Sequence, residues 1–321
     1  MKPKVLVTEP IHQVGWNLLA AETEAVAWAG PQAAPLAQAL EEAQGVIVRS
    51  ARLPGDVIRG AKQLRIIAKH GAGVEKIDVA AATACGVVVT STPAANAQSV
   101  AELALALLLS VARRIGEYTR DLTLGKPQLR QAYQGIELQG RVLGVIGLGE
   151  IGLRVGRLAG GALGMRVLAY DPYRDPWPEG IERVRTLDVL LAEADCLSIH
   201  VPLMEETRKL IGPAALAWVR PTCILVNTSR GEVVDEAALA EAIRGGRLAG
   251  AGLDVVVDEP IRPDHPLAGL PNVLLTPHLG SVTEDGLMRM ARAAAEEVLR
   301  VLQGEAPRYP VNPEALVKPN R

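Results

Sequence analysis

Val142-Leu-Gly-Val-Ile-Gly-Leu-Gly-Glu-Ile-Gly152 forms a short apolar run that leads directly into a glycine-rich turn. The pattern predicts a strand, then the turn, then a helix over Ile151–Leu163, and Gly147, Gly149 and Gly152 fit G-x-G-x-x-G. In this pattern the first glycine allows a tight turn, the second lets the backbone approach a pyrophosphate, and the third lets the helix pack on the strand. The free N–H groups and partial positive charge of the helix N-terminus favour the same pyrophosphate. The stretch therefore predicts a dinucleotide site.

An acidic residue after the next strand strengthens this prediction, because a glycine-rich turn alone can serve backbone geometry only. The strand predicted over Arg166–Tyr170 is followed by Asp171, 19 residues after Gly152, at the spacing of a carboxylate that binds a ribose 2′-hydroxyl. Because a carboxylate repels a 2′-phosphate, NAD is favoured over NADP. Arg174 is a counter-signal: it is able to contact a 2′-phosphate, and the alternative is that it faces solvent or borders the adenine.

The composition of the 321 residues limits the class of protein. Hydrophobic residues make up 49% and charged residues 22%, and the net charge is −2, which gives no electrostatic footprint for nucleic acid or an anionic membrane. The longest apolar run, Leu103–Ala112, is about half the length of a membrane span, and the N-terminus starts a strand rather than a signal peptide. Cys85, Cys196 and Cys223 lie far apart in apolar surroundings, which predicts buried free thiols and no metal site. We expect a cytoplasmic protein.

Short β-rich runs alternate with helical segments on both sides of a hinge, which predicts two doubly wound parallel α/β sheets. Before the hinge we predict strands at 5–7, 25–28, 46–48, 66–68 and 87–89, with helices at 33–43 and 56–60. After the glycine-rich unit we predict strands at 196–200, 223–227, 251–255 and 273–276, with helices at 186–194, 213–218 and 236–244. This is the content of a full dinucleotide-binding domain.

The hinge segment, 91–99, contains proline and small polar residues. Ser99 and Glu102 form a capping-box pattern before a helix over Val100–Ile115, which is apolar all round and is therefore expected to be buried between domains or against a partner subunit. Residues 116–140 are predicted as a polar loop with Gly125, Pro127, Gly135 and Gly140. A second capping-box pattern, Ser281 and Glu284, precedes a final helix to Gln303 that we expect to pack on the first unit. The expected domains are 1–98 with 284–321, and 99–283.

Two loops of the first unit follow strands directly, where ligands of open α/β sheets bind. They are Arg49-Ser50 and Lys69–Val74, and the Gly-Ala-Gly turn of the second loop, with Ala72 and Gly73, is able to present backbone N–H groups to an anion. The alternative for both loops is a solvated turn.

Three segments of the second unit carry an arginine, a glutamate and a histidine at the carboxyl ends of strands: Arg230, Glu259 and His278. A 2-keto acid needs a cation for its carboxylate, which arginine supplies with two parallel hydrogen bonds. Its carbonyl needs a proton donor as a hydride arrives, which histidine supplies near neutral pH, and a neighbouring carboxylate would hold the ring. Taken singly, each residue has a plainer interpretation. Arg230 is then a helix cap or surface partner, Glu259 a turn residue before Pro260, and His278 a loop histidine. Together, after a dinucleotide fingerprint, they predict a reductase site.

Several segments resemble the D-isomer-specific 2-hydroxyacid dehydrogenase family over nearly the whole chain: SVAELALALLL, GVIGLGEIG, HVPL, LVNTSRGEVVDEAAL, AGAGLDV with DEP, and LLTPHLGSVT. The resemblance implies a Rossmann domain inserted in a flavodoxin-like substrate domain, closure of the two domains over the substrate, and a homodimer formed by the cofactor domain. It also implies that Arg230 binds the substrate carboxylate and carbonyl, that His278 is the acid/base and that Glu259 is its partner. The remaining implied contacts to NAD or substrate are the Glu150 and Ile151 backbone on the pyrophosphate, Val201, Pro202, Thr207, Thr228 and Gly280 along the cofactor, Asp254 on the carboxamide, and the Ala72 and Gly73 amides on the substrate carboxylate.

The segments IVRSARL and KHGAGVEKIDV are most similar to the phosphoglycerate dehydrogenase and hydroxypyruvate reductase branch, which implies that Arg49, with Ser50 beside it, reads a phosphate or hydroxyl. This chain departs from that branch in two ways. The aromatic residue often found before DEP is Val256 or Val257 here, and the carboxy-terminal regulatory domain of many phosphoglycerate dehydrogenases is missing. Formate dehydrogenase pairs its histidine with glutamine, so Glu259 argues against it. A second class within the family, NAD-sensing corepressors without turnover, is the alternative.

Overall fold

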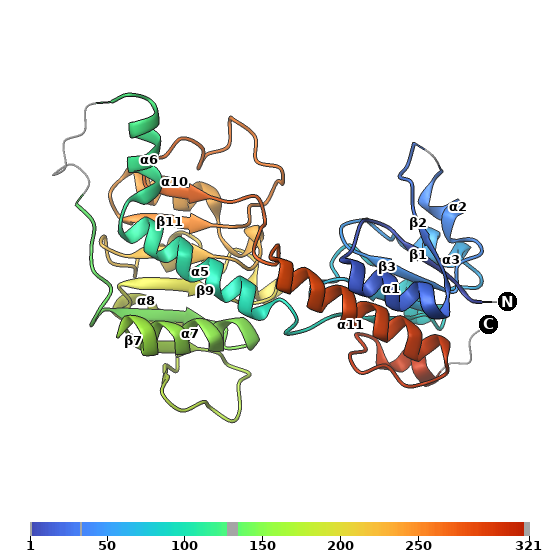
Figure 1. The fold of residues 1–321 in the computed structure, drawn as a ribbon. Coiled ribbons are helices and arrows are strands. Elements are labelled where there is room, and N and C mark those ends of the chain that lie inside the picture. Colours follow the sequence, from blue (N-terminus) through green and yellow to red (C-terminus); the bar gives the residue numbers. More distant parts are fainter. Residues whose placement is uncertain (1, 33, 127–133, 318–321) are drawn as a thin grey trace. The chain divides into compact units, whose positions relative to one another are not determined.

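The computed structural model describes residues 2–32, 34–126 and 134–317, and these form two compact units (Figure 1). Unit 1 comprises residues 1–96 and 281–321, and unit 2 comprises residues 97–280. The boundaries expected from the sequence, after 98 and before 284, lie two and three residues away. None of the described helices is long and apolar enough to cross a membrane.

Unit 1 is built on a parallel sheet of five strands in the order β2-β1-β3-β4-β5, the doubly wound order of flavodoxin-like folds. Its strands are nearly all buried on both faces, as parallel sheets covered by helices require. The strand bounds are β1 Lys4–Val7, β2 Glu24–Ala27, β3 Gly45–Val48, β4 Ile66–Lys69 and β5 Val88–Thr90.

Both ends of the chain build the helical layers of unit 1, as expected from the sequence. Helix α11 (Glu284–Leu302) packs on α1 (Gln13–Glu22), and both cover one face of the sheet through a core that includes Leu19, Ala294 and Val298 (Figure 1). Gly15 permits this contact, because a Cβ there would lie 2.5 Å from the Ala291 carbonyl oxygen. The other helices are α2 Leu36–Leu40, α3 Gly55–Gly60 and α4 Val79–Ala84, with the 3-10 turn η4 Pro313–Val317 near the end.

Unit 2 is built on a parallel sheet of seven strands in the order β12-β11-β10-β9-β6-β7-β8. Counted from β6 this is the strand order of a Rossmann fold with one strand added, and the order reverses between β6 and β9. The fold class predicted from the sequence, two doubly wound parallel sheets, is thereby confirmed. The strands are β6 Val142–Ile146, β7 Arg166–Tyr170, β8 Glu182–Arg183, β9 Cys196–Ile199, β10 Ile224–Asn227, β11 Gly250–Leu253 and β12 Val273–Leu275.

Helices cover both faces of this sheet. On one face α5 (Ala97–Ala112) packs beside α7 (Glu150–Leu163) and against β10 and β11 (Figure 1). Leu107 contributes to the contact, since a Cβ at Gly252 of β11 would lie 2.9 Å from its Cβ. The remaining helical segments are α6 Ile115–Thr123, α8 Leu187–Glu193, α9 Pro213–Leu216 and α10 Glu236–Arg244, with 3-10 turns η2 Glu205–Thr207 and η3 Gly231–Val233.

Helix starts were the weakest part of the sequence prediction. Ser99 is no N-cap, because α5 begins at Ala97 and Ser99 is buried inside it. Helix α11 is capped by Thr283, whose side chain accepts from the Gly286 amide, so Ser281 is not its cap. Helix α1 was missed since its cap is His12, an unusual capping residue.

The polar loop predicted at 116–140 is also wrong in part. Helix α6 occupies its first residues, and Ile115, Tyr118 and Leu122 give the helical spacing that the surrounding polar residues obscured. Pro127 lies outside the described residues, as does Ala33, the first residue of the helix predicted at 33–43. Helix α5 is not buried all round, because Leu109 is 37% exposed.

Candidate active site

The glycine-rich turn after β6 has the geometry that its sequence predicts. Gly147 has φ +87°, a left-handed conformation that glycine adopts without strain. A Cβ at Gly152 would lie 2.1 Å from the Gly147 carbonyl oxygen, so the turn and α7 can pack this closely only with glycine there. A Cβ at Gly147 would meet the His200 carbonyl and Val201, which places the turn at the reversal of strand order between β6 and β9.

The same turn leaves a surface on which an anion fits. Gly149 is the N-cap of α7 and has no side chain that could cap the amides of the first turn, which includes Glu150 and Ile151. A Cβ at Gly149 would meet no described atom within 4 Å. Thr228, which follows β10, has a buried hydroxyl with no hydrogen-bond partner among the described residues. An open glycine, helix amides without a side-chain cap and an orphaned hydroxyl on one sheet edge fit a dinucleotide.

Asp171 follows β7 and is bound to the same turn. Its two carboxylate oxygens accept from the Leu148 amide at 2.8 Å and from the Tyr173 amide at 2.9 Å. Each oxygen keeps a further lone pair, which is enough to accept a hydroxyl. The side chain of Arg174 is half-buried, and its Nε has no partner among the described residues.

Asp254 holds the loop that carries His278. Asp254 is 2% exposed, and its carboxylate accepts from the Thr276 hydroxyl at 2.6 Å and from the Leu279 and Gly280 amides at 2.7 Å each. Its carbonyl accepts the His278 amide at 2.9 Å. Because these bonds engage both carboxylate oxygens, Asp254 orders the loop of His278. The contact of Asp254 with the carboxamide of the cofactor stays a prediction.

The loop presents His278 in a constrained backbone conformation. His278 has φ +55°, which is uncommon for a residue with a side chain and typical of functional sites. Its Nδ1 lies 2.9 Å from Oε2 of Glu259, and the two side chains are 50% and 40% exposed. A histidine oriented by a carboxylate and accessible to solvent is able to exchange a proton with a bound substrate.

Arg230 lies on the loop after β10, and Asn227 shapes that loop. The Asn227 side chain donates to the Arg230 carbonyl at 2.8 Å and accepts from the Ser229 amide at 2.9 Å. The Arg230 guanidinium is half-buried and donates to the Ser229 carbonyl at 2.6 Å. A guanidinium fixed in this way suits a carboxylate ligand.

Gly231 joins this loop to the loop of Glu259. A Cβ at Gly231 would lie 2.2 Å from the Val256 carbonyl carbon and 2.4 Å from the Val257 nitrogen, both backbone atoms. No sequence pattern indicated this contact, because it brings together segments that are far apart in the chain.

We expect Gly231→Ala to separate the two loops. A methyl group cannot be accommodated against backbone, so the loops must shift, at a cost of ~1–3 kcal/mol in unfolding free energy. Turnover should fall by about tenfold or more because the arginine and glutamate are displaced together. Steady-state kinetics and urea unfolding measure both effects, and Gly161→Ala, where a Cβ meets no described atom, is the control. Equal turnover in the two variants would contradict the coupling.

The candidate substrate loops of unit 1 form a separate group. The Glu9 carboxylate accepts from the Arg49 amide at 3.0 Å, the Ser50 amide at 2.7 Å and the Ala51 amide at 2.6 Å, and from the Thr8 hydroxyl. Burial opposes ionisation of Glu9, but these bonds lower its pKa. Lys69 donates to the Arg49 carbonyl and so ties the two loops together. Ala72 is exposed and Gly73 half-buried, so their amides lie near the surface.

Other predicted residues have structural partners. The Thr207 hydroxyl donates to the Pro202 carbonyl at 2.7 Å and accepts from the Met204 amide at 2.8 Å, which closes the loop after β9. His200 is half-buried, and desolvation of its ring lowers its pKa to about 3, so it is neutral near pH 7. Its Nε2 lies 2.8 Å from the Ser198 hydroxyl.

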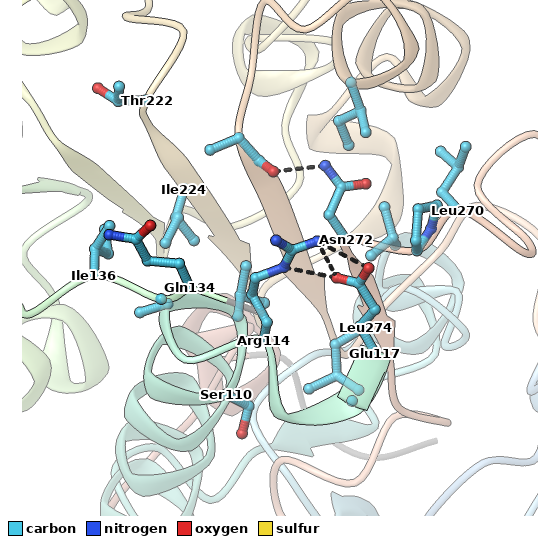
Figure 2. Close-up of a pocket in the computed structure, with 18 of the residues that line it drawn as sticks. Ser110, Arg114, Glu117, Gln134, Ile136, Thr222, Ile224, Leu270, Asn272 and Leu274 are labelled. Carbon is cyan, nitrogen blue, oxygen red and sulfur yellow. Dashed lines mark hydrogen bonds and ion pairs between the residues drawn. The ribbon is translucent and has the colours of Figure 1, made fainter. Parts of the chain in front are cut away.

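A pocket of about 670 Å³ lies at the other edge of this sheet, where β10, β11 and β12 begin. Figure 2 shows Arg114 and Glu117 paired within it, near Asn272 and Leu274. It is lined by none of the candidate catalytic residues. The chemistry predicted from the sequence therefore lies at the carboxyl ends of the strands, outside this pocket.

The sequence profile of the NAD-binding domain of the D-isomer specific 2-hydroxyacid dehydrogenases matches residues 105–280. The chain belongs to this family. Its members are oxidoreductases that act on the CH–OH group of their donors with NAD(P). The family expected from the sequence is thus confirmed, and the match covers the unit with the glycine-rich turn, Arg230, Glu259 and His278.

Two curated relatives show how far the similarity extends. The chain is 40% identical to a glyoxylate reductase of Korarchaeum cryptofilum over 98% of each protein. It is 39% identical to the D-3-phosphoglycerate dehydrogenase of Methanocaldococcus jannaschii over 96% of this chain and 59% of that protein. The chain therefore spans little more than half the length of the second relative.

Two solved structures share the fold. A protein of Thermus thermophilus is 39% identical, with a TM-score of 0.88 over 96% of this chain and 99% of that one. An NADPH-dependent glyoxylate/hydroxypyruvate reductase of Sinorhizobium meliloti, solved with NADP and malonate, is 30% identical, with a TM-score of 0.85 over 98% of each chain. A protein of the same fold has thus been solved with NADP bound.

Proposed function

We propose that the protein is an NAD-dependent D-2-hydroxyacid dehydrogenase that interconverts a small 2-keto acid and its D-2-hydroxy acid. The observation that carries the proposal is the 2.9 Å contact of His278 with Glu259, on the strand edge that also carries Arg230 and the glycine-rich turn. A general acid, its carboxylate partner, a guanidinium and a dinucleotide turn are the groups that this reaction needs.

In the proposed reaction each residue has one task. NADH, when bound, supplies the hydride that the substrate C2 receives. Arg230 binds the substrate carboxylate through its guanidinium and holds the carbonyl oxygen in place. His278 donates a proton to that oxygen, and Glu259 keeps the ring in position. In the reverse direction His278 accepts the proton from the hydroxyl.

We assign cofactor binding to unit 2 and substrate recognition to the loops of unit 1. The turn of Gly147, Gly149 and Gly152 would hold the pyrophosphate, and Asp171 would accept the ribose hydroxyl. The preference for NAD rests on the negative charge of Asp171. If NADP binds instead, Arg174 is the residue that would contact its 2′-phosphate. This alternative is kept because the Sinorhizobium protein was solved with NADP.

The substrate class follows from the relatives and from Arg49. The relatives are named for glyoxylate and for 3-phosphoglycerate, which differ in the substituent beyond C2. Arg49, tied in place by Glu9 and Lys69, would read a phosphate or hydroxyl there. Candidate substrates are therefore hydroxypyruvate, glyoxylate and 3-phosphohydroxypyruvate.

The test is oxidation of NADH, and separately of NADPH, with those three acids and pyruvate. We expect turnover with at least one acid and a higher kcat/KM with NADH. Faster reaction of the phosphorylated acid would support phosphate recognition by Arg49. Binding of NADH without turnover on any acid would contradict the proposal and favour a cofactor-sensing role.

The proposal includes a cytoplasmic homodimer formed by unit 2. Three free thiols suit a reducing compartment. Helix α6 exposes an apolar ridge, in which Ile115 is 52%, Leu122 54% and the following Leu124 65% exposed, and the pocket of Figure 2 adjoins it. Light scattering should give twice the chain mass of 34.0 kDa, and Leu122→Asp should lower it. A single-chain mass for the unsubstituted protein would refute the dimer.

A further inference from the structure

The contact between His278 and Glu259 is too weak to fix the positions of the two loops that carry these residues. Both side chains are about half exposed, and an exposed ion pair contributes only ~0–1 kcal/mol, too little to hold two loops in register. The backbone around each residue is a second source of order. Asp254 orders the backbone around His278, and bonds to the segment between β11 and β12 order the backbone around Glu259.

That segment is tied to helix α10 by a second, buried pair of a histidine and a glutamate. Nε2 of His265 lies 3.0 Å from Oε2 of Glu236, and the two side chains are only 8% and 11% exposed. The other glutamate oxygen accepts the Val257 amide at 2.8 Å, two residues before Glu259. Glu236 thus bonds to the segment on both sides of Glu259.

The hydrogen bonds assign the protonation of His265. Its Nδ1 accepts the Leu267 amide at 3.3 Å, so the ring proton lies on Nε2 and is donated to Glu236. At the other end of α10, Arg244 donates to the Pro266 carbonyl at 2.5 Å. Both ends of one helix therefore bind the segment that carries the glutamate.

We infer that Glu236 and His265 are positioning residues of the active site, which act by fixing the loop of Glu259 so that its carboxylate stays against His278. This rests on the proposed function, because it assigns the pair a task in that reaction. The buried pair of Glu236 and His265, with its hydrogen bonds satisfied, is more rigid than the exposed pair of Glu259 and His278. Loss of His265 leaves one buried carboxylate oxygen of Glu236 without a donor, and loss of Glu236 leaves the buried Nε2 of His265 without an acceptor, so the segment should open.

Four variants test the inference. His265→Leu removes both ring contacts, and Glu236→Leu removes both carboxylate contacts. His265→Gln keeps a donor toward Glu236 and should retain more activity than His265→Leu. Glu241→Gln changes an exposed glutamate of the same helix and is the matched control.

Hydrogen exchange of the protein without cofactor or substrate is the first readout. We expect faster exchange at 255–267 in the two leucine variants and unchanged exchange in the control. Kinetics is the second readout: kcat for keto-acid reduction should fall ~10–100-fold with little change in the KM for NADH, because the acid is misplaced and the cofactor turn is not.

A double-mutant cycle separates positioning from general destabilisation. In a Glu259→Gln background, His265→Leu should change kcat by less than about twofold, since the group it positions is already lost. The same fold loss in both backgrounds, or unchanged exchange at 255–267, would overturn the inference. Absence of turnover by the unsubstituted protein on every acid would refute the proposed function instead, and the exchange readout would still decide whether the pair anchors the loop.

Discussion

Substitution of His278 by asparagine is expected to lower kcat for keto-acid reduction by about 10²–10⁴-fold, the usual contribution of a positioned general acid. Asparagine is the informative replacement, because residue 278 has φ +55° and asparagine tolerates this conformation better than most residues. Its amide forms hydrogen bonds but does not transfer a proton at neutral pH. NADH affinity, measured by fluorescence titration, should be unchanged.

His12→Gln is the matched control for this substitution. His12 also lies 2.9 Å from a glutamate, Glu284, but it belongs to unit 1 and caps helix α1. Its replacement should leave kcat within about twofold of the unsubstituted protein, as expected for a site without a catalytic role. Turnover by the His278 variant at the full rate would remove His278 from its role.

Substitution of Arg230 by lysine should reduce kcat/KM for the keto acid by about 10–100-fold, the equivalent of one charge-assisted hydrogen bond. Lysine keeps the charge but lacks the planar pair of donors that a carboxylate engages. It also loses the bond by which Nη1 of Arg230 holds the Ser229 carbonyl, so the cation is less well ordered. The KM for NADH should not change.

Arg247→Lys provides the comparison for Arg230, because it alters an exposed arginine of the same unit. If the KM for the keto acid and kcat were the same in the Arg230 variant as in this control, Arg230 would not be the carboxylate ligand. A change confined to the KM for NADH would likewise contradict the assignment.

Features encoded by neighbouring residues could be predicted from the sequence. The turn of Gly147, Gly149 and Gly152 was recognisable because each glycine has a local steric reason, and the structure shows two of the close contacts directly. Alternating strands and helices likewise indicated two parallel sheets, as the structure shows.

Features that join distant segments could not be predicted. Glu9 accepts hydrogen bonds from the amides of residues 49–51, and Glu236 bonds to Val257 and His265. Neither glutamate lies in a sequence pattern from which these partners could be predicted. The same holds for Asp254, whose buried carboxylate bonds to a loop more than 20 residues away. Charge and burial of such residues depend on tertiary contacts, which local periodicity does not report.

The central claim is that hydride passes from the nicotinamide to C2 of a keto acid and gives the D-hydroxy acid. The most direct measurement uses NADH deuterated at both C4 positions with the acid of the panel that reacts fastest and yields a chiral product. Mass spectrometry and chiral chromatography of the product then identify the transferred atom and the configuration. The account predicts one deuterium at C2 and the D-enantiomer; a product without deuterium at C2, or the L-enantiomer, would contradict it.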